Sequence, residues 1–336
     1  MTHVLVARQD NAGDVLLAGP AVRAVAAGAE RVTLLCGPAG AEAARLLPGV
    51  DEVVVHEAEW IAADPRPVRR AHVERRVDDL AALGVDCALI LTSFHQSPLP
   101  LALLLRMAGV PFVGAICEDY PGSLLDVRFQ VDDDLHEVWR GLSLAQAMGF
   151  ALAEDDDDRL RVLRPGGYPP GTGHVVVHPG ASVPARAWAP DRHAALVRAL
   201  ARQGRRVIVT GGPGERALTR HVAGTWGLDL GGRTSLGELA DVLAGAACVV
   251  AGNTGPAHLA AAVRTPVVSL FAPTVPVQRW RPWGVPHALL YVPVPCAGCR
   301  ARECPVPGHP CLGGVGVEDV VAAVGRLAPL REAAAA

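Results

Sequence analysis

The sequence predicts an α/β protein made of two Rossmann-like domains that face a central cleft. Short apolar runs alternate with helical patterns along most of the 336 residues, as in parallel sheets covered by helices. A chain of this length exceeds the usual size of a single hydrophobic core. A stretch rich in proline and glycine at residues 164–173 is typical of a linker. We therefore expect domains at residues 1–163 and 174–330.

In the first half, runs of small and branched apolar residues predict strands, and longer amphipathic stretches predict helices between them. The strands are expected at Val4–Ala7, Val32–Cys36, Val53–Val55, Asp86–Leu91 and Pro111–Ile116. The helices are expected at Val15–Ala27, with an interruption at Gly19 and Pro20, and at Val68–Leu83, Leu99–Ala108 and Asp132–Gly149. Strands that alternate with helices in this way indicate a parallel sheet.

The second half repeats the scheme after the linker. Strands are expected at residues 174–178, 206–210, 228–230, 247–251 and 266–271, and helices at 190–203, 214–226, 236–245 and 256–263. The repetition predicts a second parallel sheet with its own helices, and hence a second ligand-binding edge.

All 31 basic residues are arginine, and the lack of lysine excludes several kinds of site. A Walker A phosphate loop, a pyridoxal phosphate Schiff base and a lysine-dependent aldolase each need a lysine. A net charge of −3 without a basic block argues against nucleic-acid binding. No apolar run reaches the ~18 residues of a membrane span, and the chain begins with a strand pattern instead of a signal peptide. We expect a cytoplasmic protein and leave peripheral membrane contact open.

Three strand-to-helix junctions in the second half are rich in small residues. They are the segments His178–Ser182, Gly211–Glu215 and Asn253–Gly255. Such a junction aims backbone N–H groups and the positive end of a helix dipole at one place, which suits a phosphate. Each junction alone is better explained as an ordinary loop or cap. Three consecutive junctions in one domain favour a nucleotide diphosphate site.

Side chains near these junctions are candidate ligands. Arg186 can offer a forked cation to a phosphate, although a solvated arginine would give the same pattern. Glu215 can accept hydrogen bonds from a ribose. Thr254 can cap the following helix, and Gly255 permits close approach of a ligand. His258 lies one turn into that helix, where a histidine is more often structural than catalytic.

The loop Arg8–Asp14 follows the first strand, at the sheet edge where open α/β proteins bind ligands. It lacks the glycine pattern of a dinucleotide site. Asp14 stands where a helix begins, so its carboxylate either complements the helix dipole or has a functional role. Position alone leaves both interpretations open.

In this order and register, the motifs resemble those of the family 9 glycosyltransferases, which include the ADP-heptose:lipopolysaccharide heptosyltransferases. The resemblance implies the two-domain architecture called GT-B, with the acceptor in the first domain and the nucleotide-sugar in the second. It also implies an inverting, metal-independent transfer of a heptose or related sugar from an ADP-sugar to a glycan or glycolipid hydroxyl, as in lipopolysaccharide biosynthesis. The matching segments are Arg8–Pro20, His178–Pro190, Gly211–Glu215, Thr234–Leu236, Asn253–Ala262, Thr265–Val268, Phe271–Thr274 with Trp280, and the cysteine-rich tail.

The resemblance also implies roles for individual residues. Asp14 matches the general base that acts on the acceptor hydroxyl, and Arg186 matches the basic residue, often lysine, that neutralises the departing diphosphate. The other donor-binding candidates are Ser182, Glu215, Asn253, Thr254, Gly255 and His258. Asn253 departs from the family pattern, which usually has aspartate there, and this leaves open a different sugar or weaker donor recognition.

Two alternatives remain beside the transferase. One is a non-catalytic nucleotide-sugar-binding protein of the same fold, which Asn253 favours and Asp14 opposes. The other is a nucleotide-sugar epimerase, which product analysis would separate because an epimerase needs no acceptor. A hydrolase lacks support, since the chain has neither a G-x-S-x-G nor an H-E-x-x-H motif.

The eight cysteines form two groups. Cys36, Cys87, Cys117 and Cys248 lie in apolar runs and are expected to be buried thiols. Cys296, Cys299, Cys304 and Cys311 are close together near the end of the chain, as in zinc or iron–sulfur sites. A structural zinc ion, reduced thiols and a local disulfide all remain open for this group. No metal is expected to take part in catalysis.

Five arginines lie in and before one predicted helix of the first domain: Arg66, Arg69, Arg70, Arg75 and Arg76. They could meet a phosphorylated or acidic acceptor. We favour instead a solvated face whose charge is balanced by Glu74, Asp78 and Asp79.

Overall fold

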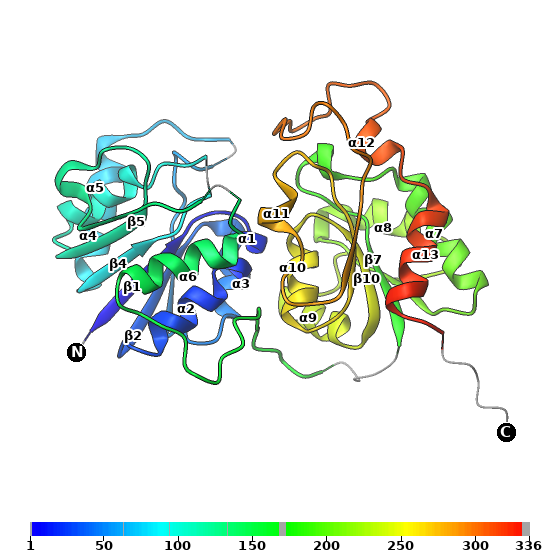
Figure 1. Cartoon of the computed structure of the whole chain (residues 1–336), viewed down its shortest axis with the longest axis horizontal. Helices are drawn as coiled ribbons and strands as arrows, with labels where there is room; N and C mark the ends of the chain where they lie inside the picture. The colour runs from blue at the N-terminus through cyan, green and yellow to red at the C-terminus, as the bar shows by residue number, and fades with distance from the viewer. Residues whose placement is uncertain (1, 63, 94, 133, 168–172, 331–336) are drawn as a thin grey trace. The chain divides into compact units, whose positions relative to one another are not determined.

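The computed structural model describes residues 2–62, 64–93, 95–132, 134–167 and 173–330, and the chain divides into two units (Figure 1). Unit 1 is Met1–Leu163 and unit 2 is Arg164–Ala336. Residues 168–172 of the predicted linker lie outside the described part. Just before them, Asp241 accepts hydrogen bonds from the backbone N–H groups of Gly166 (2.8 Å) and Gly167 (2.9 Å), which ties this part of the linker to unit 2.

Unit 1 is built on a six-stranded sheet in which all paired strands run parallel. Its order is β3-β2-β1-β4-β5-β6, the order found in dinucleotide-binding sheets. The central strands are covered on both faces, which explains why they read as continuous apolar runs. The strands are β1 (His3–Arg8), β2 (Arg31–Cys36), β3 (Glu52–Val55), β4 (Cys87–Ile90), β5 (Phe112–Ile116) and β6 (Val127–Phe129).

The helices of unit 1 form two groups, α4 with α5 and α2 with α6 (Figure 1). Leu5 of β1 and Leu105 of α5 belong to one buried cluster. Pro20 lies in the first turn of α2, where its missing N–H is tolerated, so the predicted interruption is confirmed. The helices are α1 (Ala12–Leu17), α2 (Gly19–Ala26), α3 (Ala41–Arg45), α4 (Arg70–Ala82), α5 (Leu99–Met107) and α6 (Glu137–Ala147).

Unit 2 repeats this arrangement with a second parallel sheet, of order β12-β11-β10-β7-β8-β9. Read from β9, the order is again that of a dinucleotide-binding sheet, with β7 and β10 in the centre. The strands are β7 (His174–His178), β8 (Val207–Val209), β9 (Leu228–Asp229), β10 (Ala246–Gly252), β11 (Val267–Leu270) and β12 (His287–Leu290).

Helices α7, α8 and α13 pack together in unit 2, and α9 packs on α10. Val177 of β7, Leu196 of α7 and Val324 of α13 share one buried cluster. The helices are α7 (Pro190–Arg202), α8 (Arg216–Ala223), α9 (Leu236–Ala244), α10 (Gly255–Ala262), α11 (Val277–Trp280), α12 (Pro310–Gly313) and α13 (Val317–Leu327). In the described part of the chain, no helix has both the length and the apolar character needed to span a membrane.

Several helix boundaries differ from those predicted; α1, for example, begins at Ala12 and α8 ends at Ala223. The helix expected from Asp132 begins at Glu137, because the ring of His136 accepts a hydrogen bond from the Val138 N–H (3.2 Å) and caps the helix there. The helix expected from Gly214 begins at Arg216, after a 3₁₀ turn at Pro213–Glu215. Strands β6 and β12 and helices α3, α11, α12 and α13 were not predicted. The rest of the predicted α/β scheme is confirmed.

Candidate functional site

Open α/β sheets bind ligands at the switch point, where the loops after two central strands leave in opposite directions. In unit 1 this point lies between β1 and β4, and in unit 2 between β7 and β10. Asp14 follows β1, Arg186 lies in the loop after β7, and Thr254 follows β10. The predicted site residues of each unit therefore lie at or next to the switch point of that unit.

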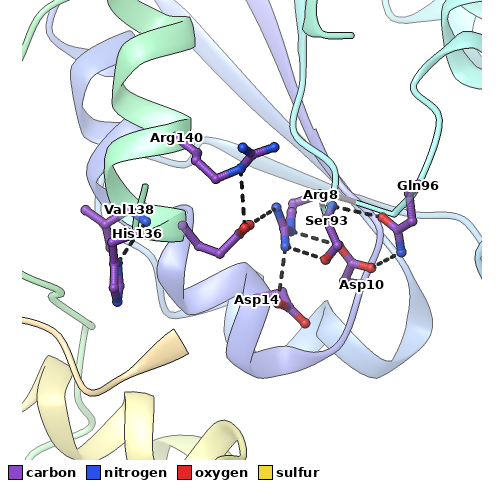
Figure 2. Close-up of polar contacts among 9 residues, drawn as sticks. Arg8, Asp10, Asp14, Ser93, Gln96, His136, Val138 and Arg140 are labelled. Atoms are coloured by element: carbon purple, nitrogen blue, oxygen red, sulfur yellow. Dashed lines mark hydrogen bonds and ion pairs between the residues drawn. The ribbon is translucent and has the colours of Figure 1, made fainter. Parts of the chain in front are cut away.

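In unit 1 the centre of the switch point is Arg8, the last residue of β1 (Figure 2). Its Nε lies 2.9 Å from an Asp10 oxygen, one terminal nitrogen lies 3.2 Å from Asp14 Oδ1, and the other lies 3.3 Å from Glu137 Oε2. Ser93, after β4, accepts a further hydrogen bond from Arg8 (3.0 Å). One buried cation thus joins three carboxylates, from the loop after β1, from α1 and from α6.

Asp10 receives hydrogen bonds from two side chains. Of the three carboxylates, only Glu137 is less exposed to solvent. Gln96 donates to one of its oxygens (2.5 Å), and Ser93 donates to the other (3.4 Å). Burial raises the pKa of the Asp10 carboxyl, while Arg8 lowers it and Asp14 raises it again. Burial alone would lower the pKa of the Arg8 guanidinium, but Asp10, Asp14 and Glu137 together raise it above its ordinary value. The Arg8 guanidinium is therefore held in its charged state by the three carboxylates around it.

Asp14 lies in the first turn of α1 and keeps more exposure than the other carboxylates. Its side chain is 18% exposed, against 7% for Asp10 and 2% for Glu137. It lines a small pocket together with Arg8, Glu137 and Arg140. Asp14 is thus the carboxylate of the network that a substrate in this pocket can reach.

The small pocket continues into a wider groove of unit 1. Arg140 and Ile116 line both, and the groove has a volume of about 610 Å³. Its other lining residues come from the loop after β5, from β6 and the segment that follows it, and from α6, and they include Glu118, Phe129, Gln130 and Ser143. A groove of this volume, with an aromatic ring and several polar groups, has the dimensions and chemistry of a small-molecule or sugar site.

In unit 2, Glu215 lies across the ends of β7 and β8. One of its oxygens accepts a hydrogen bond from the Gly212 N–H (2.7 Å) and lies 3.9 Å from His178 Nε2. The other lies so close to Gly180 that a Cβ built there would approach it to 2.0 Å. Glycine at position 180 is therefore required by the position of the Glu215 carboxylate.

His178 is buried next to the Glu215 carboxylate. Its Nδ1 lies 3.0 Å from Thr210 Oγ1. Burial lowers the pKa of His178, and Glu215 only partly opposes this effect. The imidazole is thus a neutral support for the loop. Ser182 is exposed on the same loop.

The end of β10 carries polar atoms that lack partners. Among the described residues, the buried Asn253 Oδ1 and Thr254 Oγ1 have no hydrogen-bond partner, whereas Asn253 Nδ2 donates to the Ala272 carbonyl (3.3 Å). Thr254 occupies the N-cap position of α10, but its side chain makes no capping hydrogen bond, so the predicted cap is wrong in that respect. Gly255 opens the helix, and His258 is buried one turn later. At this helix start the Thr254 hydroxyl can donate to an anion, whereas the Asn253 oxygen can only accept a hydrogen bond, as from a ligand hydroxyl.

Arg186 ends a short 3₁₀ turn at Pro184–Arg186 and is half-buried. Its Nε donates to Thr274 Oγ1 (3.3 Å), and its carbonyl oxygen would lie 3.1 Å from a Cβ at Gly252, the last residue of β10. The close approach to Gly252 brings the loop after β7 against the start of α10. A guanidinium beside a helix N-terminus can bind a diphosphate without a metal ion.

The structure gives the predicted zinc site no support. The four C-terminal cysteines all line one pocket, but among the described residues no three His, Cys, Asp or Glu side chains are placed to hold a metal ion. Burial raises the pKa of the Cys311 thiol, and Cys304 adds to the effect. All eight cysteines are unpaired, and the first four are buried as predicted.

The cysteine-rich segment is tied to the loops that carry the candidate donor residues. The Gly298 N–H donates to the Pro273 carbonyl (2.7 Å), and the Arg300 N–H donates to the Thr274 carbonyl (3.0 Å). The Ala185 N–H in turn donates to the Arg302 carbonyl (2.9 Å). This segment therefore supports the position of Thr274 and, through it, of Arg186.

Within the described ranges, two of the five arginines in and before α4 make ion pairs, and only the one at Arg70 fits the solvated face that the sequence favoured. Arg70 pairs with Glu74 at 2.6 Å on the surface of α4. Arg76 is largely buried between Glu59 and the Glu57 carbonyl. Arg69 is the N-cap residue of α4 and Arg66 precedes it, so these two lie outside the helix.

The sequence analysis did not identify the partners of Asp14. The sequence does indicate a site role for Arg8, because a charged residue at the end of an apolar strand lies at the ligand-binding edge of the sheet. The sequence does not indicate such a role for Glu137, since its contact with Arg8 joins residues 129 positions apart. Ser93 likewise becomes part of the site only because β4 lies beside β1.

The chain is similar to known proteins in both sequence and fold. The profile of glycosyltransferase family 9 (heptosyltransferase) matches residues 95–309, well over half of the chain. Lipopolysaccharide heptosyltransferase 3 of Escherichia coli strain K12 is 33% identical over 121 residues, which cover 33% of this chain and 33% of that protein. Lipopolysaccharide heptosyltransferase 1 of Pseudomonas aeruginosa is 31% identical over 229 residues, 66% of this chain and 64% of that protein. The matches thus span a third and just under two thirds of these relatives.

Among solved structures, the Escherichia coli heptosyltransferase WaaC with ADP aligns with a TM-score of 0.69. The alignment covers 97% of this chain and 99% of that one, at 19% sequence identity. At this identity the likeness establishes the fold, and it agrees with the two parallel six-stranded sheets of the present structure.

Proposed function

The chain belongs to glycosyltransferase family 9, as the sequence predicted, and from this premise we propose that it transfers a heptose from ADP-heptose to a hydroxyl group of a glycan or glycolipid acceptor. The transfer inverts the anomeric centre and needs no metal ion. Unit 1 binds the acceptor and unit 2 binds the nucleotide-sugar. The observation that carries this proposal is the different chemistry of the two switch points, a carboxylate network in unit 1 and an anion site with unsatisfied polar atoms in unit 2.

In the proposed reaction Asp14 is the general base. Its carboxylate takes the proton of the acceptor hydroxyl as that oxygen attacks the anomeric carbon. The attack comes from the face opposite the diphosphate, so the new bond forms with inversion. The location of Asp14 in a pocket, with more exposure than Asp10 or Glu137, supports this role.

Arg186 and the start of α10 stabilise the leaving group. As the bond from the anomeric carbon to the diphosphate breaks, the bonding electrons stay on the diphosphate, whose added charge is met by the Arg186 guanidinium. The Gly255 backbone N–H and the Thr254 hydroxyl donate to the same anion, while the Thr254 N–H donates to the Gly252 carbonyl. Ser182 and His258 complete this surface, and Glu215 accepts hydrogen bonds from the ribose. The ADP in the WaaC structure supports an adenine nucleotide donor here.

The acceptor lies in the groove that continues from the pocket of Asp14. Phe129 can stack on a sugar ring, and Gln130 and Ser143 can bind sugar hydroxyls. Arg140, at the junction of pocket and groove, provides a positive charge near acidic groups of an acceptor. The names of the curated relatives support a lipopolysaccharide core as the source of such an acceptor.

Nucleotide titration tests the donor half of the proposal. We expect ADP to stabilise the purified protein against heat more than UDP, GDP or dTDP does, with the same result in a chelator. A preference for another nucleotide would keep the fold but exclude ADP-heptose as the donor. Loss of ADP binding in the chelator would contradict the metal-independent mechanism. No metal at the four C-terminal cysteines forms part of the proposal.

Product analysis tests the transfer itself. With ADP-heptose and a lipopolysaccharide core acceptor, we expect one product whose anomeric configuration is opposite to that of the donor, as read by NMR coupling constants. Retention of configuration would contradict the mechanism. An altered nucleotide-sugar formed without acceptor would identify an epimerase instead.

A further inference from the structure

We infer that Arg8 is a positioning residue for the proposed transfer, in that it fixes the direction of the Asp14 carboxylate and keeps a cation beside it while the acceptor is bound. The inference rests on the proposed role of Asp14 and adds to it a residue to which no role has been assigned.

Each nitrogen of the Arg8 guanidinium is bound to a different carboxylate (Figure 2). The nitrogen that contacts Asp14 also donates to Ser93 (3.0 Å). Because a guanidinium is planar, contacts on all three nitrogens fix its orientation as well as its position. The oxygen of Asp14 that faces Arg8 is therefore held at one place relative to β1.

The anchors of Arg8 come from parts of unit 1 that are rigid and buried. Glu137 lies in the first turn of α6, and its side chain is 2% exposed. Asp10 is held by Gln96 in addition to Arg8. Asp14, at 18% exposure, is the member of the network that lines the pocket with the best access to substrate. The arrangement thus fixes one end of the guanidinium in the protein and presents the other to the reacting carboxylate.

The charges around Asp14 make the cation necessary. Asp10 and Glu137 approach the same guanidinium as Asp14, and Arg140 lies 3.4 Å from Glu137. These four residues, Arg8, Asp10, Glu137 and Arg140, are the charged groups that face Asp14 in unit 1 from β1, its loop and α6. Without Arg8, Asp14 would lie among two other carboxylates in a pocket from which acceptor binding removes water. Such surroundings favour the protonated carboxyl, which cannot act as a base.

The test uses two substitutions of Arg8 in the full-length protein. Arg8→Gln removes the charge, and Arg8→Lys keeps the charge but not the fork. We expect Arg8→Gln to lower kcat about 100-fold, as misplacement of a reacting group does. We expect the acid limb of its pH–rate profile to move to higher pH by about one unit or more. Arg8→Lys should show a smaller loss of kcat with little movement of the limb. Neither should change the KM for the donor.

Arg23→Gln is the matched control. Arg23 is as buried as Arg8 and binds Asp156 through two nitrogens (2.7 and 2.9 Å), also in unit 1 but outside the pocket of Asp14. Loss of this ion pair should lower the thermal stability and leave the pH profile unchanged. If Arg8 has only a structural role, Arg8→Gln will behave in the same way.

The outcomes separate this inference from the proposed function. A folded Arg8→Gln protein with an unchanged pH profile and kcat would overturn the inference. If Arg8→Gln does not fold, the inference is tested with Arg8→Lys alone. Full activity of Arg8→Lys would then overturn the inference. The proposed function fails separately, if Asp14→Asn retains turnover in the same assay.

Discussion

The switch points of the two units have the same topology and opposite chemistry. In unit 1, Arg8 is bound by three carboxylates and a serine, so the charged groups neutralise one another inside the protein. In unit 2, the corresponding place has glycines, a helix start and, among the described residues, two buried oxygens without a hydrogen-bond partner, on Asn253 and Thr254. One sheet edge thus holds a charged network of its own side chains, and the other holds small residues and a helix start.

This difference shows how two domains of the same fold can have different roles. A carboxylate that must take up a proton needs a fixed direction and a controlled charge, which the buried ion network supplies. A diphosphate needs unoccupied donors and a cation, which the glycine-rich loops, α10 and Arg186 supply. We propose that the first sheet provides the base and the second the donor site.

The largest effect is expected for Asp14→Ala. Loss of the general base should lower kcat about 10³-fold, while the fold is retained because Asp14 lies at the edge of its network. Steady-state transfer to the acceptor measures it. Glu42→Ala, which removes another carboxylate from the first turn of a helix in unit 1, is the control and should be fully active. Turnover in Asp14→Ala within a few-fold of the wild type would break the comparison.

Arg186→Gln should have the next largest effect and act on the donor. Loss of a charged hydrogen-bond donor to the diphosphate corresponds to about 1.5–3 kcal/mol, or about 10- to 150-fold in ADP affinity. Arg186→Lys should recover part of it, since the family often has lysine there. The control is Arg192→Gln, which alters an arginine of α7 that donates to the Val315 carbonyl (2.6 Å). An unchanged Kd for ADP in Arg186→Gln would exclude Arg186 from the donor site.

Acid should destabilise the protein through the buried histidines of unit 2. Burial lowers the pKa of His193 to about 3, so the folded state resists a proton that the unfolded state accepts below about pH 6.5. Stability is therefore complete above pH 6.5 and falls as the pH decreases. At pH 5 the loss from His193 amounts to about 2 kcal/mol.

Thermal melts between pH 7.5 and 5 test this pH dependence. His193→Phe preserves the edge-on packing against Trp188 and should flatten the decline. His221→Phe, at an exposed histidine paired with Asp191, should leave it as in the wild type. If the melting temperature falls equally with decreasing pH in all three proteins, His193 is not held neutral by burial.

The smallest effect is expected for Gly180→Ala. The added methyl group meets a Glu215 oxygen, so the carboxylate must move away from the ribose position while the fold remains. The KM for the donor should rise about 5-fold, the value of one hydrogen bond. Gly214→Ala is the control, because nothing lies within 4 Å of a Cβ there. Equal KM values would remove Glu215 from the donor site.

The fold could be predicted from the sequence because its signals are local. The alternation of apolar strands and helices gave the main strands of both sheets and the break between α1 and α2. The two missed strands lack such signals: β6 has three residues, and β12 is half-buried at a sheet edge. Helix α13 did carry one, since its buried residues Val320, Ala323 and Val324 follow helical spacing and acidic residues lie in its first turn. The beginning of α6 depended on a histidine cap, a residue outside the usual capping set.

The site could be predicted only in part, for a related reason. Asp14, Arg186 and Thr254 follow strands directly, so topology alone leads to them. Glu137 enters through a helix far along the chain, and Arg8 takes its meaning from contacts with distant residues. The Glu215 carboxylate lies against Gly180 across two neighbouring strands, a contact that no sequence pattern contains.

The most direct test of the central claim is calorimetric titration of ADP into the wild type, Asp14→Asn and Arg186→Gln. If the base belongs to unit 1 and the diphosphate site to unit 2, ADP will bind Asp14→Asn with the wild-type Kd and Arg186→Gln at least 10-fold more weakly. Weakened binding in Asp14→Asn together with unchanged binding in Arg186→Gln would contradict this division of roles between the two sheets.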